Sequence, residues 1–190
     1  MANPHCAKAD VYTIGHSTRQ IDEFLTLLQS CEIALLVDVR TIPKSRRNPQ
    51  FNIDMLPASL ADAGIAYEHM PGLGGLRHTL RDSPNTGWRN ASFRGYADYM
   101  ETPEFETNLA RLIDIMSRRR TAIMCAEALP WRCHRSLIAD ALVVRGHAVN
   151  HIFSRTKFQP HVITTWARVE GTKITYPAPA EPSVLPVNST

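Results

Sequence analysis

The amino-acid sequence predicts one α/β domain, built on a mainly parallel sheet of about five strands with helices on both faces. Short apolar runs alternate along the chain with amphipathic stretches, which is the pattern of strand–helix units in a parallel sheet. The chain has 190 residues, of which 44% are hydrophobic and 21% are charged. These values suit a single domain with a core of ordinary size.

The first elements follow from the pattern between residues 11 and 64. Apolar runs predict strands at 11–15 (VYTIG) and 33–39 (IALLVDV). Between them we expect a helix that begins near Ser17 and Thr18. Its apolar side is formed by Phe24, Leu25, Leu27 and Leu28. A second helix over 53–63 should end at Gly64, because glycine readily adopts the left-handed conformation of a helix cap.

The next elements lie between residues 65 and 153. We expect strands at 65–70 (IAYEHM), 121–126 (TAIMCA) and 147–153 (HAVNHIF). Residues 71–95 predict a long polar connection, typical of a lid or a binding loop. Thr102 and Pro103 are suited to begin a helix, as its cap and its first turn. The apolar face of this helix is formed by Phe105, Leu109, Leu112, Ile113 and Met116. A last helix should run from Pro130 to Gly146.

The two ends of the chain differ from the domain between them. Residues 1–10 are expected to form a flexible N-terminus, and the α/β domain to span 11–176. Residues 177–190 contain four prolines and almost no charge, which predicts a disordered tail.

Composition restricts the location and the partners of the protein. The formal net charge of +3 does not by itself mark a nucleic-acid-binding protein. The most apolar run, Ile33 to Val37, is far too short to span a bilayer, and the N-terminus has no signal-peptide core. The four cysteines have no disulfide-like spacing. We therefore expect a cytoplasmic protein with no membrane partner.

Polar side chains follow every predicted strand. Parallel strands share one carboxyl edge, where ligands bind in such sheets, so these groups should meet there. The groups are His16, Ser17 and Arg19 after the first strand, Asp38, Arg40, Arg46 and Arg47 after the second, Tyr67 and His69 at the third, the stretch 125–135 (CAEALPWRCHR) after the fourth and His151 at the fifth.

The basic side chains of this edge predict an anion site. Guanidinium groups and the free N–H groups at helix N-termini both favour phosphate or carboxylate. The predicted ligand-binding residues are Ser17, Arg19, Arg40, Arg46, Arg47, Arg132 and Arg135. Their expected partner is a phosphorylated or nucleotide-like small molecule. The alternative is that these arginines pair with the 18 acidic residues of the chain and are solvated.

Carboxylates and histidines at the same edge are candidates for acid–base chemistry. Glu127 and Asp38 are the two carboxylates, and either a catalytic role or a structural ion pair fits them. His16 and His134 are candidates for proton transfer or for orienting a substrate. The sequence does not determine whether the protein is an enzyme, which cofactor it uses or what its oligomeric state is.

The two cysteines of the stretch 125–135 allow several interpretations. Cys125 is a candidate nucleophile or a buried apolar residue, but the stretch lacks glycine and does not have the spacing of a phosphatase loop. Cys133 lies near a helix N-terminus beside arginines, which favours its thiolate. A Cys/His metal site remains an alternative, although adjacent Cys133 and His134 rarely bind one ion, so we predict no metal ligand. Nucleic-acid binding through arginine-rich loops near Trp88, Phe93 and Tyr96 is another alternative.

Several motifs, in order along the chain, resemble one known family. They are YTIGHSTR, DVRTIPKSRR, LGG, YMETPEF, MCAEALPWRCHR and HVITTWARVEGTKITYP. Over about residues 11–177 the chain resembles the domain-of-unknown-function family DUF488. The resemblance implies an α/β domain and carries no established activity.

Overall fold

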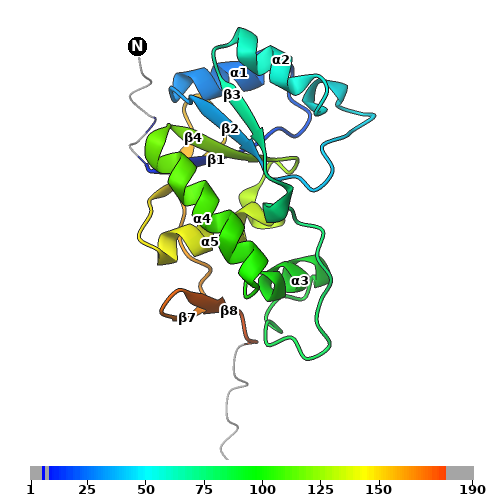
Figure 1. Cartoon of the computed structure of the whole chain (residues 1–190), viewed down its shortest axis with the longest axis vertical. Helices are drawn as coiled ribbons and strands as arrows, with labels where there is room; N and C mark the ends of the chain where they lie inside the picture. Colours follow the sequence, from blue (N-terminus) through cyan, green and yellow to red (C-terminus); the bar gives the residue numbers. More distant parts are fainter. Residues whose placement is uncertain (1–5, 7–8, 179–190) are drawn as a thin grey trace, which may run out of the picture.

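The computed structural model describes residue 6 and residues 9–178. Most of the predicted flexible N-terminus and proline-rich tail lies outside the described residues. One sheet has the strand order β3-β2-β4-β1-β5-β6. Figure 1 labels the first four strands of this order. Its strands are β1 Val11–Gly15, β2 Leu35–Asp38, β3 Ala66–His69, β4 Thr121–Cys125, β5 Val149–Ile152 and β6 Phe158–Pro160. The first five pair in parallel and β6 is antiparallel, which confirms the predicted mainly parallel sheet.

Five α-helices connect these strands. They are α1 Ile21–Ser30, α2 Leu56–Asp62, α3 Ala91–Tyr99, α4 Pro103–Arg118 and α5 Arg135–Val144. Three short 3₁₀ turns are η1 Pro49–Phe51, η2 Pro71–Leu73 and η3 Pro130–Arg132. Positive φ angles at Gly64 and Gly146 confirm that these glycines follow helix ends.

The sheet is covered on both faces, as predicted. Side chains of β4 alternate between two cores: Ala122 and Met124 pack with the apolar residues of α1 and α2, whereas Ile123 packs with those of α3, α4 and α5. Figure 1 shows α1 and α2 together at one end of the view, with α4 and α5 lying away from them. The alternation follows from strand geometry, because successive side chains point to opposite faces.

Three element boundaries differ from the sequence-based expectation. Helix α1 begins at Ile21 and not near Ser17, because Ser17 has φ of 50° and its N–H donates to the Ala126 carbonyl. Pro130 begins the turn η3, and α5 starts only at Arg135. Helix α3 begins inside the predicted connection 71–95. It contains Gly95, where a Cβ atom would collide with the backbone of residues 77–79, so the glycine lets that segment pack on the helix.

The C-terminal part of the described chain was not predicted as regular structure. Strand β6 and the hairpin β7 Arg168–Glu170 with β8 Lys173–Thr175 are each three residues long, which is too short for a clear periodic pattern. Asp140 of α5 holds this part in place. Its carboxylate accepts hydrogen bonds from the backbone and hydroxyl of Thr164, from the Tyr176 hydroxyl and from His161 Nε2.

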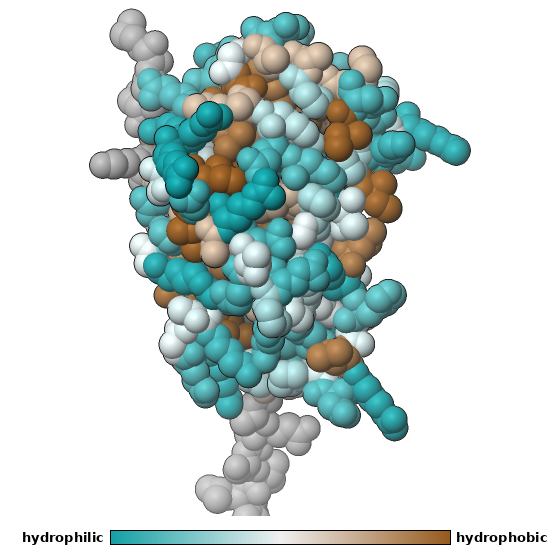
Figure 2. Space-filling view, in the orientation of Figure 1, coloured by the Kyte–Doolittle hydropathy of each residue, from teal (hydrophilic) through white to brown (hydrophobic). Residues whose placement is uncertain are grey.

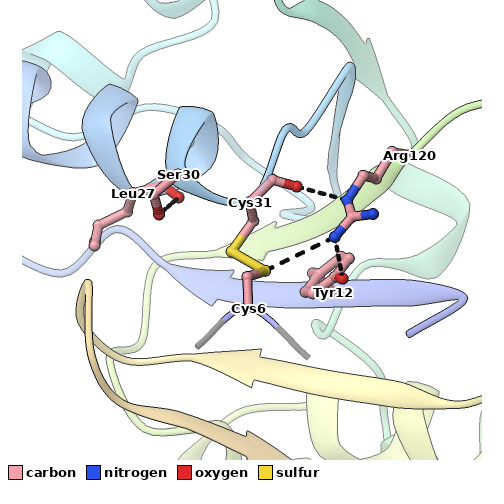
Figure 3. Close-up of a disulfide and its surroundings, with 6 residues drawn as sticks. All are labelled: Cys6, Tyr12, Leu27, Ser30, Cys31 and Arg120. Carbon is pink, nitrogen blue, oxygen red and sulfur yellow. Dashed lines mark hydrogen bonds between the residues drawn. A yellow bond between two sulfur atoms is a disulfide. The ribbon is translucent and has the colours of Figure 1, made fainter. Parts of the chain in front are cut away.

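Cys6 and Cys31 form a disulfide that joins the segment before β1 to the end of α1 (Figure 3). The expectation that the cysteine spacing indicates no disulfide is therefore wrong for this pair. Spacing carried no signal because the fold, and not sequence separation, brings the two residues together. Arg120 lies beside the disulfide, donating to the Cys31 carbonyl at 2.6 Å and to the Tyr12 hydroxyl at 2.6 Å.

We expect the Thr102→Ala variant to lose about 1 kcal/mol of unfolding free energy, because Thr102 Oγ1 caps α4 by accepting from Phe105 N–H. Urea denaturation measures this loss. Thr107→Ala is the matched control, since the Thr107 hydroxyl is exposed and bonds only within the helix. Equal losses in both variants would contradict the capping role.

Among the described residues, no helix is both long and apolar enough to cross a bilayer. On the face drawn in Figure 2, hydrophobic residues occur in small groups between hydrophilic ones.

Candidate functional site

A cavity of about 330 Å³ opens at the carboxyl ends of the neighbouring strands β2 and β4. This is the edge at which parallel sheets bind ligands. Its walls come from residues 40–42 after β2, 75–76, 92–93 in α3, 125–127 after β4 and 132–134 before α5. The cavity therefore brings together segments that are far apart in the sequence.

Two thiols and one imidazole meet in this cavity. His134 Nε2 donates to the Val39 carbonyl at 3.1 Å, so the neutral ring presents the lone pair of Nδ1 on its other side. That Nδ1 atom lies 4.0 Å from Cys125 Sγ and 3.7 Å from Cys133 Sγ. The three donor atoms all lie within 4.8 Å of one another.

The two buried thiols differ in acidity. A hydrogen bond with Cys133, together with burial, raises the pKa of Cys125 well above its ordinary value. Burial acts to raise the pKa of Cys133 as well, but interactions with Cys125, His134 and Arg135 outweigh burial and bring that pKa well below its ordinary value. The two shifts run in opposite directions, so Cys133 is the more acidic thiol of the pair.

Glu127 and Arg132 are the exposed charged side chains of the cavity wall. Within the described part of the chain, neither side chain has a hydrogen-bond or ion-pair partner. Ile42, Leu76 and Phe93 supply an apolar part of the wall. The arrangement offers a ligand one cationic group, one carboxylate and an apolar surface.

Asp38 does not line this cavity. Its carboxylate is fully buried and forms an ion pair with Arg40, with 2.6 Å between Oδ2 and a terminal guanidinium nitrogen. The Tyr67 hydroxyl also donates to it at 2.9 Å. Arg40 in turn donates to the Phe51 carbonyl at 2.7 Å. Part of Arg40 also lines the cavity. These contacts favour the structural ion pair for Asp38 over the catalytic role.

His16 belongs to the same buried cluster. Its Nδ1–H donates to the Ser17 carbonyl at 2.8 Å, and its Nε2 accepts from Arg40 at 3.2 Å. Burial, with a further contribution from the Arg40 charge, lowers the pKa of His16 to about 4. The ring stacks on Phe51 with 4.3 Å between centroids. His16 is therefore a neutral, tightly packed side chain at neutral pH.

Two of the predicted anion-binding arginines hold the protein's own backbone. Arg19 donates to the carbonyls of Gly15 and Phe153, each at 2.7 Å. Arg135 is buried and donates to the Glu127 carbonyl at 2.5 Å, so it supports the loop after β4. Of the seven residues predicted to bind an anion, only Arg40 and Arg132 line the cavity.

The other predicted residues lie elsewhere. Arg46 and Arg47 are exposed on the segment between β2 and η1 and are not part of the wall. Ser17 is occupied in the turn after β1, where its backbone N–H donates to the Ala126 carbonyl.

Several residues of the cavity were not assigned from the sequence. At Gly75 a Cβ atom would collide with the His134 ring, so this glycine makes room for the histidine. In the sequence, the motif LGG at 73–75 stands out only as a family feature. Its second glycine, Gly75, is the residue that could have indicated a close approach of another side chain. The sequence indicates for Phe93 only a role in stacking on nucleic acid, because no helix is predicted over residues 91–99, where α3 lies.

A second group of polar side chains crosses the protein between β1 and α5. Thr13 Oγ1 lies 2.8 Å from His151 Nδ1, and His151 Nε2 lies 2.9 Å from His161 Nδ1. His161 then contacts Asp140 at 2.7 Å. Burial, followed by the charges of His161 and Arg135, lowers the pKa of His151 to about 3. Among these four residues, the sequence pattern indicated only His151 as a member of the carboxyl edge.

The fold and the cavity define an α/β protein with a cysteine–histidine site at the carboxyl edge of a mainly parallel sheet. The chain belongs to the family described as Domain of unknown function DUF488, whose model matches residues 20–142. This match confirms the family and includes every segment of the cavity wall, whereas the first and the last of the family-like motifs lie outside the matched residues. No curated protein and no solved structure matches the chain.

Proposed function

We propose that the protein binds a phosphorylated or nucleotide-like small molecule in the cavity between β2 and β4, where Arg132 pairs with the anionic group and Glu127 exchanges protons. The observation that carries the proposal is the pair of charged side chains on the wall that have no protein partner among the described residues. The cavity volume of about 330 Å³ falls within the usual range of small-molecule sites.

The aromatic contacts favour a small molecule over a nucleic acid. Bases of a single strand need exposed aromatic faces on which to stack. Trp88 instead packs against Phe93, Trp166 and Tyr176, with ring centroids 4.8 to 5.5 Å apart. Tyr96 is fully buried. These residues therefore offer little surface for stacking bases.

A binding screen of sugar phosphates and nucleotides by thermal shift, followed by calorimetry, tests the proposal. We expect Arg132→Ala to weaken the best ligand at least about tenfold, because a charge-assisted hydrogen bond contributes about 1.5 to 3 kcal/mol. Arg89→Ala is the matched control, since Arg89 is exposed and lies outside the cavity. If no compound binds, or if both variants weaken binding equally, the proposal is wrong.

A further inference from the structure

Cys125, Cys133 and His134 form a donor set that the proposed anion binding does not use. Sulfur and imidazole nitrogen are the ligands that Zn²⁺ takes in proteins, and catalytic zinc sites combine three such ligands with one open position. The cavity lies directly beside all three side chains. An ion bound by them would therefore have its remaining position open to whatever enters the cavity.

The spacing of the donor atoms suits a tetrahedral ion. Bonds of about 2.3 Å to sulfur and about 2.0 Å to nitrogen place tetrahedral donors about 3.5 to 3.8 Å apart. His134 Nδ1 lies 3.7 Å from one sulfur and 4.0 Å from the other, and no pair exceeds 4.8 Å. Small side-chain movements would bring the three donors onto one ion.

The surroundings of His134 fix it in the orientation that a ligand needs. A metal-bound histidine usually donates its other ring N–H to a carbonyl or carboxylate, which sets the tautomer. His134 does so through Nε2 to the Val39 carbonyl. The ring of Tyr96 packs 5.0 Å from the imidazole, and Gly75 leaves the space that the imidazole fills.

Local backbone geometry removes the objection that adjacent residues rarely share an ion. Cys133 is extended, with φ of −138° and ψ of 145°, as the residue that ends the turn η3. His134 has helical angles, φ of −55° and ψ of −15°, as the cap of α5. This change of conformation between the two residues turns both side chains toward Cys125.

The charge balance of the buried site also suits a dication. Two thiolates compensate the charge of one Zn²⁺ ion. Arg135 is buried nearby, and among the described residues its guanidinium donates only to backbone carbonyls and to Thr13. Its positive charge is therefore available to balance an anionic ligand, such as hydroxide, at the open position.

We propose that Cys125, Cys133 and His134 bind one Zn²⁺ ion whose fourth coordination position faces the cavity. The inference goes beyond the proposed function, because metal binding does not require any ligand in the cavity. Glu127, on the same wall, is the carboxylate that would act on a molecule bound at the open position.

The test uses the full chain, freed of metal by a chelator, and measures Zn²⁺ binding by competition with a chromophoric chelator. We expect one ion per chain with a dissociation constant below about 1 μM. Cys133→Ser and His134→Ala should each weaken Zn²⁺ binding by more than about a hundredfold. A loss of this size separates a metal ligand from a residue that only supports a ligand, whose removal costs at most about a hundredfold in metal affinity. His78→Ala is the control for an exposed histidine. The double variant Cys6→Ala with Cys31→Ala is the control for cysteines outside the site, because the two are joined in a disulfide and neither is left as a free thiol.

Substitution with Co²⁺ keeps the test valid even if a variant fails to fold. The wild-type chain should show the thiolate-to-cobalt charge-transfer band and the visible absorption of tetrahedral coordination. Binding weaker than about 1 μM, a cobalt spectrum without thiolate bands, or unchanged affinity in Cys133→Ser would each overturn the proposal. None of these results bears on the ligand screen, so the two proposals fail separately.

Discussion

The Asp38→Asn variant is expected to unfold with a free energy about 3 to 5 kcal/mol lower than that of the wild type. Asp38 is fully buried and accepts four hydrogen bonds, three from Arg40 and one from Tyr67. Asparagine has nearly the same shape, so the substitution creates no cavity. It leaves the buried Arg40 guanidinium without its counter-charge, which is the main source of the cost.

Urea denaturation at neutral pH measures this effect. Asp54→Asn is the matched control, because Asp54 is exposed and should change stability by no more than about 0.5 kcal/mol. The double variant Asp38→Asn with Arg40→Met should recover part of the loss, since no unpaired charge then remains buried. A loss below about 1 kcal/mol in Asp38→Asn would show that the ion pair does not support the fold.

Lowering the pH from 6.5 to 5 should destabilise the protein by about 3 kcal/mol through two buried histidines. Burial lowers the pKa of His16 to about 4 and that of His151 to about 3, whereas both titrate near 6.5 in the unfolded chain. Below pH 6.5 the unfolded chain therefore takes up protons that the folded chain does not. Stability is lost as the pH falls, and each histidine contributes about half of the total.

Denaturation curves at several pH values between 7 and 5 test this dependence. His16→Gln should flatten the curve by about half, because it removes one of the two titrating groups. His78→Ala should leave the slope unchanged, since His78 is exposed in the folded chain. A stability that is constant over this range would contradict the neutral, buried state of both histidines.

The sheet was predictable because its signal is local. Strands β1, β2 and β4 lie in mainly apolar runs, and β3 lies in an alternating stretch. Glycines that follow helices, such as Gly64, mark the boundaries between elements. Helix α3 was not predicted, because Gly95 interrupts the helical pattern of its sequence. The glycine is needed there for the close approach of residues 77–79. Strand β6 has only three residues and ends in a proline, which gives no periodicity to read.

The position of the candidate cavity was also predictable, but the contacts that its residues make were not. The carboxyl-edge rule brought the loops after β2 and β4 together, as the structure does. Which arginines remain available depends on carbonyls from distant segments, such as the Phe153 carbonyl that accepts from Arg19. The meeting of Cys125 with His134 depends likewise on the change from extended backbone at Cys133 to helical backbone at His134, which no spacing rule describes.

The Asp140 carboxylate joins the C-terminal segment of the described chain to helix α5. The family model stops at residue 142, yet the hydrogen bonds that Asp140 accepts from side chains and backbone come from His161, Thr164 and Tyr176. A chain cut after β5 would keep the buried carboxylate and lose these donors. We therefore expect the segment from His161 to Tyr176 to unfold together with the sheet, so that the cooperative unit extends more than thirty residues past the end of the family match.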